Sequence, residues 1–254
     1  MTHPIHIGIG GWTFEPWRGV FYPPGLVQKR ELEFASRALT SIEINGTYYS
    51  TFKPDSWMKW RDETPDDFVF AVKASRYCTN RKVLAGMGES MGRFLDQGLT
   101  ALGDKLGPVN WQFMGTKKFD PEDFESFLKL LPQEQDGVRL RHALEVRHPS
   151  FDTQQFYDLA AKYGAAIVYA VDDESPDWPR IDQPTADFTY ARLMSSRDDE
   201  PTGLTAAELE TVAVRTRTWA ERGAVFAYFI SGAKVRNPAA AQALIARLGS
   251  IPAD

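Results

Sequence analysis

The sequence predicts an α/β protein folded as a single TIM (β/α)8 barrel over residues 1–254. Short runs rich in β-branched and aromatic residues recur eight times, and segments with helical spacing of apolar residues separate most of them. Strands that alternate with helices are typical of a parallel sheet, and about 250 residues suit eight such units. A doubly wound open sheet is the alternative, but no glycine-rich phosphate loop opens a helix after the first strand.

The predicted strands are short and apolar, as strands buried under helices should be. They cover residues 6–11, 41–45, 68–74, 108–113, 142–148, 165–172, 188–194 and 224–230. Helical spacing is clearest over residues 30–39, 92–106, 120–131, 153–164, 205–223 and 237–249. Asp120 before Pro121 and Asn237 before Pro238 indicate the N-caps of two helices. Three prolines between the sixth and seventh strands predict that the sixth helix is short or missing.

The composition is that of an ordinary globular protein, with 43% hydrophobic and 25% charged residues. The one cysteine, Cys78, excludes an internal disulfide and a cysteine zinc cluster, and suits a reducing cytosol. No signal peptide precedes the first strand and no apolar run approaches a membrane span in length, so we expect a cytoplasmic protein without a membrane partner. The net charge of −5 argues against non-specific binding to nucleic acid. The sequence predicts no oligomeric state.

Strand periodicity places polar side chains inside the barrel. In the second strand Ile42 and Ile44 suit the face toward the helices, so Glu43 and Asn45 point into the lumen. The same alternation adds polar side chains from five further strands, namely Lys73, Asn110, Gln112, Glu145, Arg147, Asp172, Tyr190 and Arg192. Both faces of the eighth strand are apolar, so its orientation stays open. Barrel enzymes carry their sites at the carboxyl ends of the strands, and most of the ionisable residues fall there.

This end of the predicted barrel collects three acidic and three basic side chains. They are Glu43, Glu145, Asp172, Lys73, Arg147 and Arg192. Unpaired burial of any one of them would cost several kcal/mol, so the charges must pair, bind a ligand or touch water. A purely structural ion cluster is one interpretation. The excess of polar groups over what a packed barrel needs favours a binding site for a polar ligand.

We predict four catalytic residues in this site. Glu145 and Asp172, on neighbouring strands, form an acid/base pair. Glu43 orients Lys73 or Arg147. Lys73 supplies a buried amine, and formation of a Schiff base with a substrate is an alternative role for it. The predicted substrate-binding residues are Trp12, Asn45, Tyr48, Tyr77, Gln112, Arg147, His148 and Arg192. The cations would hold an anion, the amides would bind hydroxyl groups, and the aromatic rings would either stack on the ligand or simply pack the loops.

We predict no metal site and no cofactor. The chain has four histidines, and only His148 is expected at the carboxyl end of the barrel, whereas zinc sites usually take several. Binding of Mg²⁺ or Mn²⁺ through Glu43, Glu145 or Asp172 stays the alternative.

Several stretches of the sequence resemble the YecE-like proteins, the family called domain of unknown function 72. They are GIGGWTFEPWRGVFYP (8–23), SIEINGTYYS (41–50), TPDDFVFAVKASRY (64–77), DKLGPVNWQF (104–113), ALEVRHPSF (143–151) and YF (228–229). The resemblance covers nearly the whole chain and implies a TIM barrel. It places Glu43, Asn45, Tyr48, Lys73, Gln112, Glu145 and Arg147 on the family's motif positions, and it implies no particular reaction.

Two sites, comprising three residues, depart from the pattern that this resemblance implies. Asn80 stands where the family usually has histidine, and Ile230 and Ser231 stand where it usually has paired asparagines. Both changes remove a polar group or a potential ligand, which argues against a metal-dependent function and for a different substrate. The family's fold is similar to xylose-isomerase-like and endonuclease-type barrels, which suggests sugar or DNA ligands only by analogy.

The function we predict is that of an uncharacterised YecE-like enzyme, a hydrolase or an isomerase. It would act by acid/base chemistry on a small anionic ligand, a phosphorylated or sugar-containing molecule. Two alternatives stay open: a nucleic-acid binding or processing protein that uses the same end of the barrel, and a non-catalytic binding or scaffold barrel with a structural ion cluster.

Overall fold

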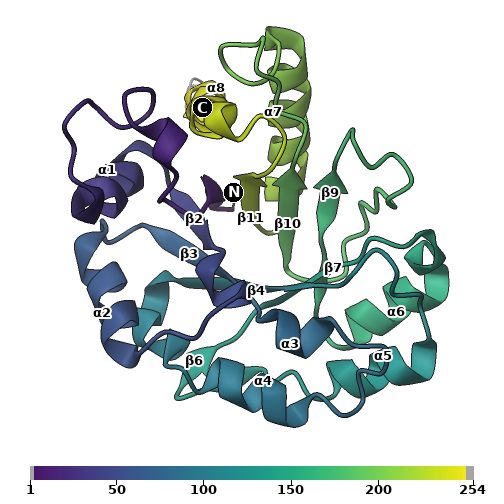
Figure 1. The fold of residues 1–254 in the computed structure, drawn as a ribbon. Coiled ribbons are helices and arrows are strands. Elements are labelled where there is room, and N and C mark those ends of the chain that lie inside the picture. The colour runs from purple at the N-terminus through teal and green to yellow at the C-terminus, as the bar shows by residue number, and fades with distance from the viewer. Residues whose placement is uncertain (1–2, 250–254) are drawn as a thin grey trace.

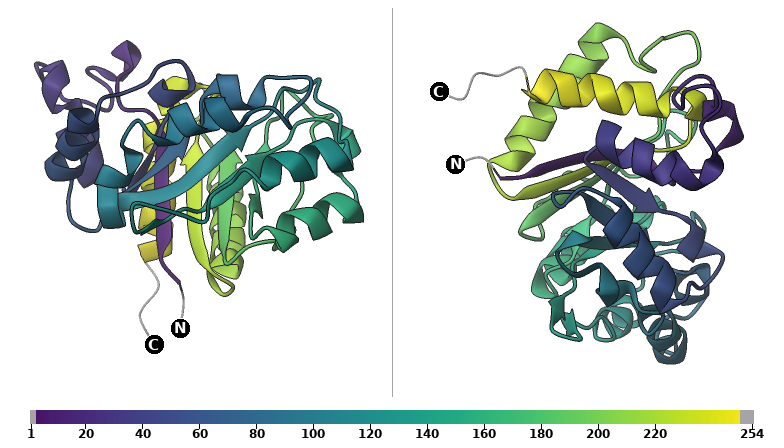
Figure 2. Two further views of the ribbon diagram at one scale, coloured as in Figure 1. Left: turned by 90° about the horizontal axis from the view of Figure 1, so that it is seen from below. Right: turned by 90° about the vertical axis from the view of Figure 1, so that its left-hand side faces the viewer.

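A single parallel sheet, wound into a barrel, forms the centre of the computed structural model, which describes residues 3–249 (Figure 1). The sheet order is β8-β7-β4-β3-β2-β1-β11-β10-β9. The strands are β1 (Ile5–Gly10), β2 (Ser41–Ile44), β3 (Val69–Lys73), β4 (Leu106–Gln112), β7 (His142–Glu145), β8 (Ala166–Ile167), β9 (Tyr169–Val171), β10 (Phe188–Leu193) and β11 (Ala224–Phe229). Strand β1 runs toward the viewer of Figure 1, so that figure looks onto the carboxyl ends of the strands, here called the mouth (Figure 2).

The sixth strand closes the barrel by dividing its hydrogen bonds between two neighbours. Its first half, β8, pairs with β7, and its second half, β9, pairs with β10. The Val168 amide donates to the Leu144 carbonyl at 3.0 Å, and the Met194 amide donates to the Val171 carbonyl at 2.7 Å. The predicted barrel is therefore confirmed, and the doubly wound alternative is wrong.

Helices cover the outside of the barrel on most sides. They are α1 (Glu31–Ala38), α2 (Pro54–Glu63), α3 (Arg76–Thr79), α4 (Gly88–Leu95), α5 (Pro121–Leu128), α6 (Gln154–Lys162), α7 (Ala206–Ala220) and α8 (Asn237–Gly249). A short antiparallel hairpin, β5 (Glu134–Gln135) and β6 (Val138–Arg139), precedes β7. The Asp120 side chain caps α5 as predicted, by accepting from two backbone amides of its first turn. Asn237 instead adopts helical backbone, and its amide group donates to the Ser231 carbonyl.

Two other expectations about the helices have clear outcomes. Residues 92–106 do not form one helix, because Gly98 takes a φ of +97° after α4 ends, and tight 3-10 turns follow over Leu99–Lys105. Residues 172–187 contain no helix, so the predicted loss of the sixth helix is confirmed. The connection between β9 and β10 is therefore an irregular loop where the barrel pattern would place a helix (Figure 1).

Side-chain alternation along the strands separates two apolar regions. Outward residues such as Ile42, Ile44 and Trp111 are buried under the helices. The lumen is filled by a second cluster, which includes Ala71, Ala143, Ala170, Phe188, Tyr190, Phe226 and Tyr228. The eighth strand, β11, thus turns Phe226 and Tyr228 inward. The apolar filling occupies the lower lumen and leaves the charged side chains near the mouth.

Candidate active site at the barrel mouth

Arg192 on β10 is the centre of the polar cluster in the lumen, and it is buried. Its Nη1 donates to Oε2 of Glu145 at 2.7 Å and to Oε1 of Gln112 at 3.3 Å, while its Nη2 donates to Oε1 of Glu43 at 3.1 Å. Burial lowers the pKa of Arg192, but the two carboxylates more than compensate, and the pKa lies above the ordinary value of 12.5. Arg192 is therefore always charged and links β10 to β2 and β7 across the lumen.

Glu43 is completely buried and engages only protein donors. Its Oε2 accepts a hydrogen bond from the Tyr190 hydroxyl and one from Nδ2 of Asn110 at 3.2 Å. Burial and the charge of Glu43 both raise the pKa of Tyr190 well above its usual value, so this hydroxyl stays a donor. Tyr190 and Asn110 were placed in the lumen by strand periodicity without a role, and the structure makes them the partners of Glu43.

Glu145 is equally buried, and both of its oxygens are occupied. Oε1 accepts from Nε of Arg147 at 2.9 Å and from its Nη2 at 2.6 Å, and Oε2 accepts from Arg192 and, at 3.1 Å, from Asn110. Burial would raise the pKa of Glu145, but Arg192, Arg147 and Lys73 together lower it to about 2. A carboxylate this acidic, with no free lone pair facing the mouth, does not fit the predicted role in proton transfer.

Lys73 at the end of β3 differs from other buried lysines of this protein. Its side chain is 9% exposed, as is that of Lys105. The Lys105 ammonium donates to three oxygens of Arg61 and Thr64 at 2.6–3.3 Å. The Lys73 ammonium makes no hydrogen bond or ion pair within residues 3–249, and its neighbour is the ring face of Tyr48, 4.3 Å from Nζ to the ring centre. Its charge is thus left without an acceptor.

Burial and charge act together on the Lys73 amine. Burial is the largest cause and the Arg192 charge the next, and together with Arg147 they outweigh Glu43 and Glu145 and lower the pKa of Lys73 from 10.5 to about 8. Glu43 and Glu145 already accept hydrogen bonds from the arginines. At pH 7 about a tenth of Lys73 is therefore neutral, and at pH 8 about half.

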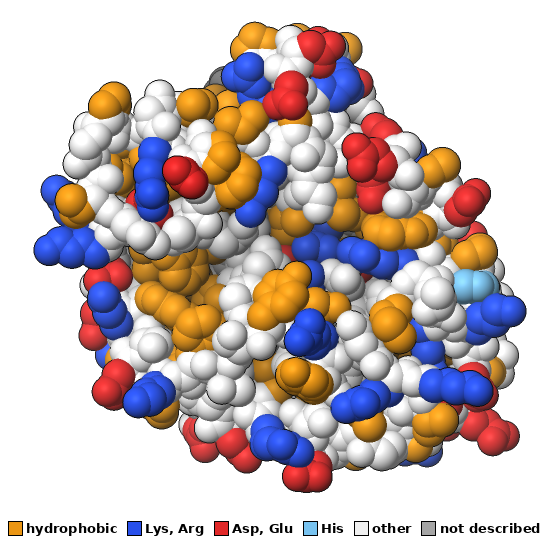
Figure 3. Space-filling view, in the orientation of Figure 1, with side chains coloured by type: hydrophobic (Ala, Val, Ile, Leu, Met, Phe, Trp, Pro, Cys, Tyr) orange, Lys and Arg blue, Asp and Glu red, His pale blue; other side chains and the backbone are white. Residues whose placement is uncertain are grey.

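Arg147 is the outermost member of the ion cluster, defined here as Glu43, Lys73, Glu145, Arg147 and Arg192. Its side chain is 18% exposed, and its guanidinium lies 4.1 Å above the ring of Trp178 from the loop after β9. Nε and Nη2 both bind Glu145, while Nη1 donates to no other residue in the described chain. Figure 3 shows basic side chains at the hollow in the middle of this face. One guanidinium nitrogen is thus available to a ligand.

Tyr48 and Asn45 follow β2, and the Tyr48 ring lies against Nζ of Lys73. The Tyr48 hydroxyl accepts from Nδ2 of Asn80 at 3.0 Å, so the residue that departs from the implied family pattern helps to hold the ring under Lys73. The Oδ1 atom of Asn45 is buried and has no hydrogen-bond partner. Gly10 makes room for this side chain, because a Cβ there would lie 2.5 Å from Asn45 Nδ2. Both residues remain candidates for ligand contacts.

Asp172 is not brought together with Glu145. Its Oδ1 accepts from the Glu174 amide at 3.1 Å and so stabilises the turn after β9, and no hydrogen bond or ion pair joins it to a member of the ion cluster. β9 ends at Val171, one residue before Asp172, so the predicted acid/base pair has no direct contact between its two carboxylates.

Three other predicted binding residues have local structural partners. Trp12 packs edge-on against Trp60 of α2, with ring centres 5.2 Å apart. His148 uses Nδ1 to accept from the Ser150 amide at 3.1 Å and so caps a short turn. Tyr77 is 53% exposed, and the guanidinium of Arg76 lies 5.3 Å from its ring centre. Packing against α2 explains Trp12, and capping of a turn explains His148.

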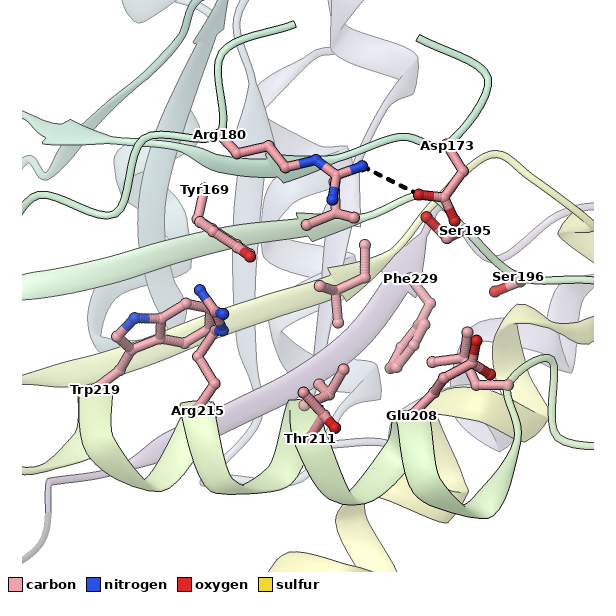
Figure 4. A pocket seen from close by; sticks show the side chains of 14 residues that line it. Tyr169, Asp173, Arg180, Ser195, Ser196, Glu208, Thr211, Arg215, Trp219 and Phe229 are labelled. Atoms are coloured by element: carbon pink, nitrogen blue, oxygen red, sulfur yellow. Dashed lines mark hydrogen bonds and ion pairs between the residues drawn. The ribbon is translucent and has the colours of Figure 1, made fainter. Parts of the chain in front are cut away.

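A separate cavity of about 320 Å³ lies on the outside of the barrel, where the sixth helix is absent (Figure 4). Tyr169, Leu193 and Phe229 from the sheet face Trp219 and Arg215 from α7 across it. An Arg180–Asp173 ion pair of 3.1 Å lies at its edge. The cavity is on the opposite side of the sheet from the ion cluster and does not belong to the mouth.

Within residues 3–249, no group of three or more His, Cys, Asp and Glu side chains is placed to hold a metal ion. In the same part of the chain, no helix has both the length and the apolar character that crossing a membrane requires.

A family model described as protein of unknown function DUF72 matches residues 6–253. The chain belongs to the DUF72 family. UPF0759 protein YecE from Escherichia coli strain K12 is 29% identical over 150 residues, which are 58% of this chain and 50% of that protein. UPF0759 protein YunF from Bacillus subtilis strain 168 is 25% identical over 177 residues, 67% of this chain and 61% of that protein. The chain thus spans about half of the first curated relative's length.

The barrel is shared with a solved structure of the DUF72 family. A DUF72 family protein from Thermotoga maritima MSB8 superimposes with a TM-score of 0.79 at 22% identity, covering 98% of this chain and all of that one. At this identity the likeness shows the fold alone. The predicted family and the predicted barrel are therefore both confirmed, and the chemistry of the DUF72 mouth must be argued from its residues.

Replacing Arg192 should strongly destabilise the protein. In Arg192→Met, two buried carboxylates lose their shared cation, which should lower the free energy of unfolding by about 3–5 kcal/mol. Arg180→Met is the matched control, because its ion pair with Asp173 is half exposed and should contribute less than about 1 kcal/mol. Urea unfolding of both variants gives the comparison. Equal losses in the two variants would show that Arg192 does not organise the cluster.

The stability contribution of Lys73 should change with pH. Since its pKa of about 8 in the folded chain lies below the ordinary 10.5, the unfolded chain binds more protons between these values. Stability of the wild type should therefore rise relative to Lys73→Met from pH 7 to pH 11, by up to about 3 kcal/mol. Urea unfolding at several pH values measures the difference. A constant difference would mean that Lys73 titrates normally.

Proposed function

We propose that the protein is an enzyme that binds a small anionic molecule, with a phosphate or carboxylate group, at the barrel mouth. The observation that supports this is the Lys73 ammonium, which is buried beside two arginines without an acceptor of its own. Buried charges in proteins are paired, bind a ligand or lose their charge. An anionic group would complete the pairing that the protein leaves open.

The charge of the ion cluster supports the same ligand class. Lys73, Arg147 and Arg192 carry three positive charges, and Glu43 and Glu145 carry two negative charges, so the cluster has a net charge of +1. The protein as a whole carries −5. A mouth that is positive inside an acidic protein attracts a small anion by local contacts rather than by the overall field. Nη1 of Arg147 and Nζ of Lys73 would donate to the anion.

The proton-transfer role moves from Glu145 to Lys73. A general acid or base works best when its pKa lies near the working pH, and Lys73, with a pKa of about 8, meets this condition, whereas Glu145, with about 2, does not. Glu145 would instead hold Arg147 and Arg192 in place. Asn45, whose Oδ1 has no partner, and Gln112, which accepts from Arg192, would bind hydroxyl groups of a sugar-like ligand.

Thermal unfolding with matched ligands tests the proposal. Ribose 5-phosphate and inorganic phosphate should stabilise the wild type, and ribose should not. A ligand at a hundredfold excess over its Kd adds about 2.7 kcal/mol, and each kcal/mol raises Tm by about 2–4 °C in a domain of this size. Lys73→Met should lose the shift. Lys59→Met, at an exposed site on α2, should retain it.

Either of two results would contradict the proposal. One is a wild-type Tm that no phosphorylated or carboxylated compound raises. The other is an equal shift in Lys73→Met, which would locate the anion elsewhere on the protein and leave the mouth as a structural ion cluster.

A further inference from the structure

We infer that Lys73 is a nucleophile that forms an imine with a ligand carbonyl group, and that the substrates are phosphorylated or carboxylated aldehydes or ketones. This inference rests on the proposed anion site and names the substrate class of that site. It goes beyond proton transfer, because the lysine nitrogen becomes covalently bound to the substrate.

The Lys73 nitrogen has a lone pair available for attack on a carbonyl group. An ammonium that donates to protein acceptors is held in its charged form, as Lys105 is by three oxygens. Lys117, which is similarly buried, donates to the Lys82 carbonyl and to Asp123. Lys73 has none of these acceptors, and the nearby arginine charges favour its neutral form. A desolvated amine beside another cation is the usual environment of a lysine that attacks carbonyl groups.

Arg147, which would bind the anionic group, follows a strand two places away from the strand of Lys73. Lys73 ends β3 and Arg147 follows β7, and β4 lies between these strands. Two strand spacings correspond to about 10 Å along the sheet, and the charge of Arg147 still acts on the Lys73 amine. A ligand that contacts both must carry its anionic group a few atoms from its carbonyl carbon. Arg147 has the free Nη1 for that group.

The Tyr48 ring forms one side of the space around the Lys73 amine. The Tyr48 ring lies against Nζ and is held through its hydroxyl by Asn80. The ring limits the directions from which a carbonyl carbon can approach. Asn45 follows Ile44, which pairs with Val72, so its backbone lies beside that of Lys73, and its buried Oδ1 is an acceptor without a partner. It suits the hydroxyl of the carbinolamine that precedes the imine.

The chemistry is balanced without any further reagent. The Nζ lone pair attacks the carbonyl carbon and forms a C–N bond, and a proton passes from nitrogen to oxygen to give the carbinolamine. Loss of the hydroxyl with the second nitrogen-bound proton releases one water molecule and leaves the imine. A proton from solvent makes the imine cationic, so that it can accept the electron pair of a C–H bond at the neighbouring carbon. The released proton passes to solvent and is taken up again when the resulting enamine returns to the imine. Water then hydrolyses the imine and restores the Lys73 amine.

Reductive trapping tests the imine on the wild-type protein. The protein is incubated with D-glyceraldehyde 3-phosphate, reduced with borohydride and digested, and the modified lysines are identified by mass spectrometry. Lys73 should carry at least tenfold more adduct than the exposed Lys59, and saturating inorganic phosphate should prevent the reaction at Lys73. D-Glyceraldehyde, which lacks the phosphate, should give at least tenfold less adduct at Lys73. In Arg147→Met, the phosphorylated and unphosphorylated aldehydes should give similar amounts of adduct at Lys73. Competition by inorganic phosphate tests the anion site in the wild-type protein.

The results separate this inference from the proposed function. Adduct on exposed lysines with Lys73 unmodified would overturn the imine. If phosphate still raised the Tm of the wild type and not of Lys73→Met, the anion site would stand, with Lys73 acting on protons alone. If phosphate had no effect on Tm and Lys73 formed no adduct, both would fall.

Discussion

The contact of one guanidinium with two buried carboxylates organises the barrel mouth. Arg192 reaches Glu145 at 2.7 Å and Glu43 at 3.1 Å, and these three residues come from β10, β7 and β2. The interaction therefore connects distant positions around the barrel, where parallel strands alone would contact only their neighbours. Asn110 joins the two carboxylates from β4. The apolar lower lumen provides the low dielectric in which these contacts are strong and their loss is costly.

This arrangement determines what the remaining charges can do. Because both carboxylates are occupied by arginines and amides, neither can neutralise Lys73, and the net charge of the cluster is carried by that amine. Arg147 shares Glu145 with Arg192 but keeps one nitrogen toward the mouth. Some members of the ion cluster therefore have a structural role, and others are available to bind a ligand. Glu43, Glu145 and Arg192 build the framework, and Lys73 and Arg147 are left for a ligand.

Strand periodicity was enough to predict the barrel and five of the six charged side chains at its mouth, Asp172 being the exception. The alternation of Ile42, Glu43 and Ile44 fixes which side chain points inward, since the period of a strand is two residues. Periodicity could not predict which charges pair, because that depends on tilt and register around the closed sheet. It thus suggested Glu145 with Asp172, whereas the strand ends one residue before Asp172 and Glu145 binds the arginines. Periodicity also could not choose between stacking and loop packing for Trp12 or show that His148 caps a turn, because their partners, Trp60 and Ser150, are set by loop conformation.

The central claim is that Lys73 is a buried cation without a partner, and its own titration tests this most directly. Nuclear magnetic resonance of the protein carrying ¹³C at the lysine Cε positions, with Lys73→Met to assign the signal, gives the pKa of this amine. The account predicts a pKa of about 8 in the free protein and a higher value when inorganic phosphate is bound, because a nearby anion favours the charged form. A pKa near 10.5 that phosphate leaves unchanged would contradict it.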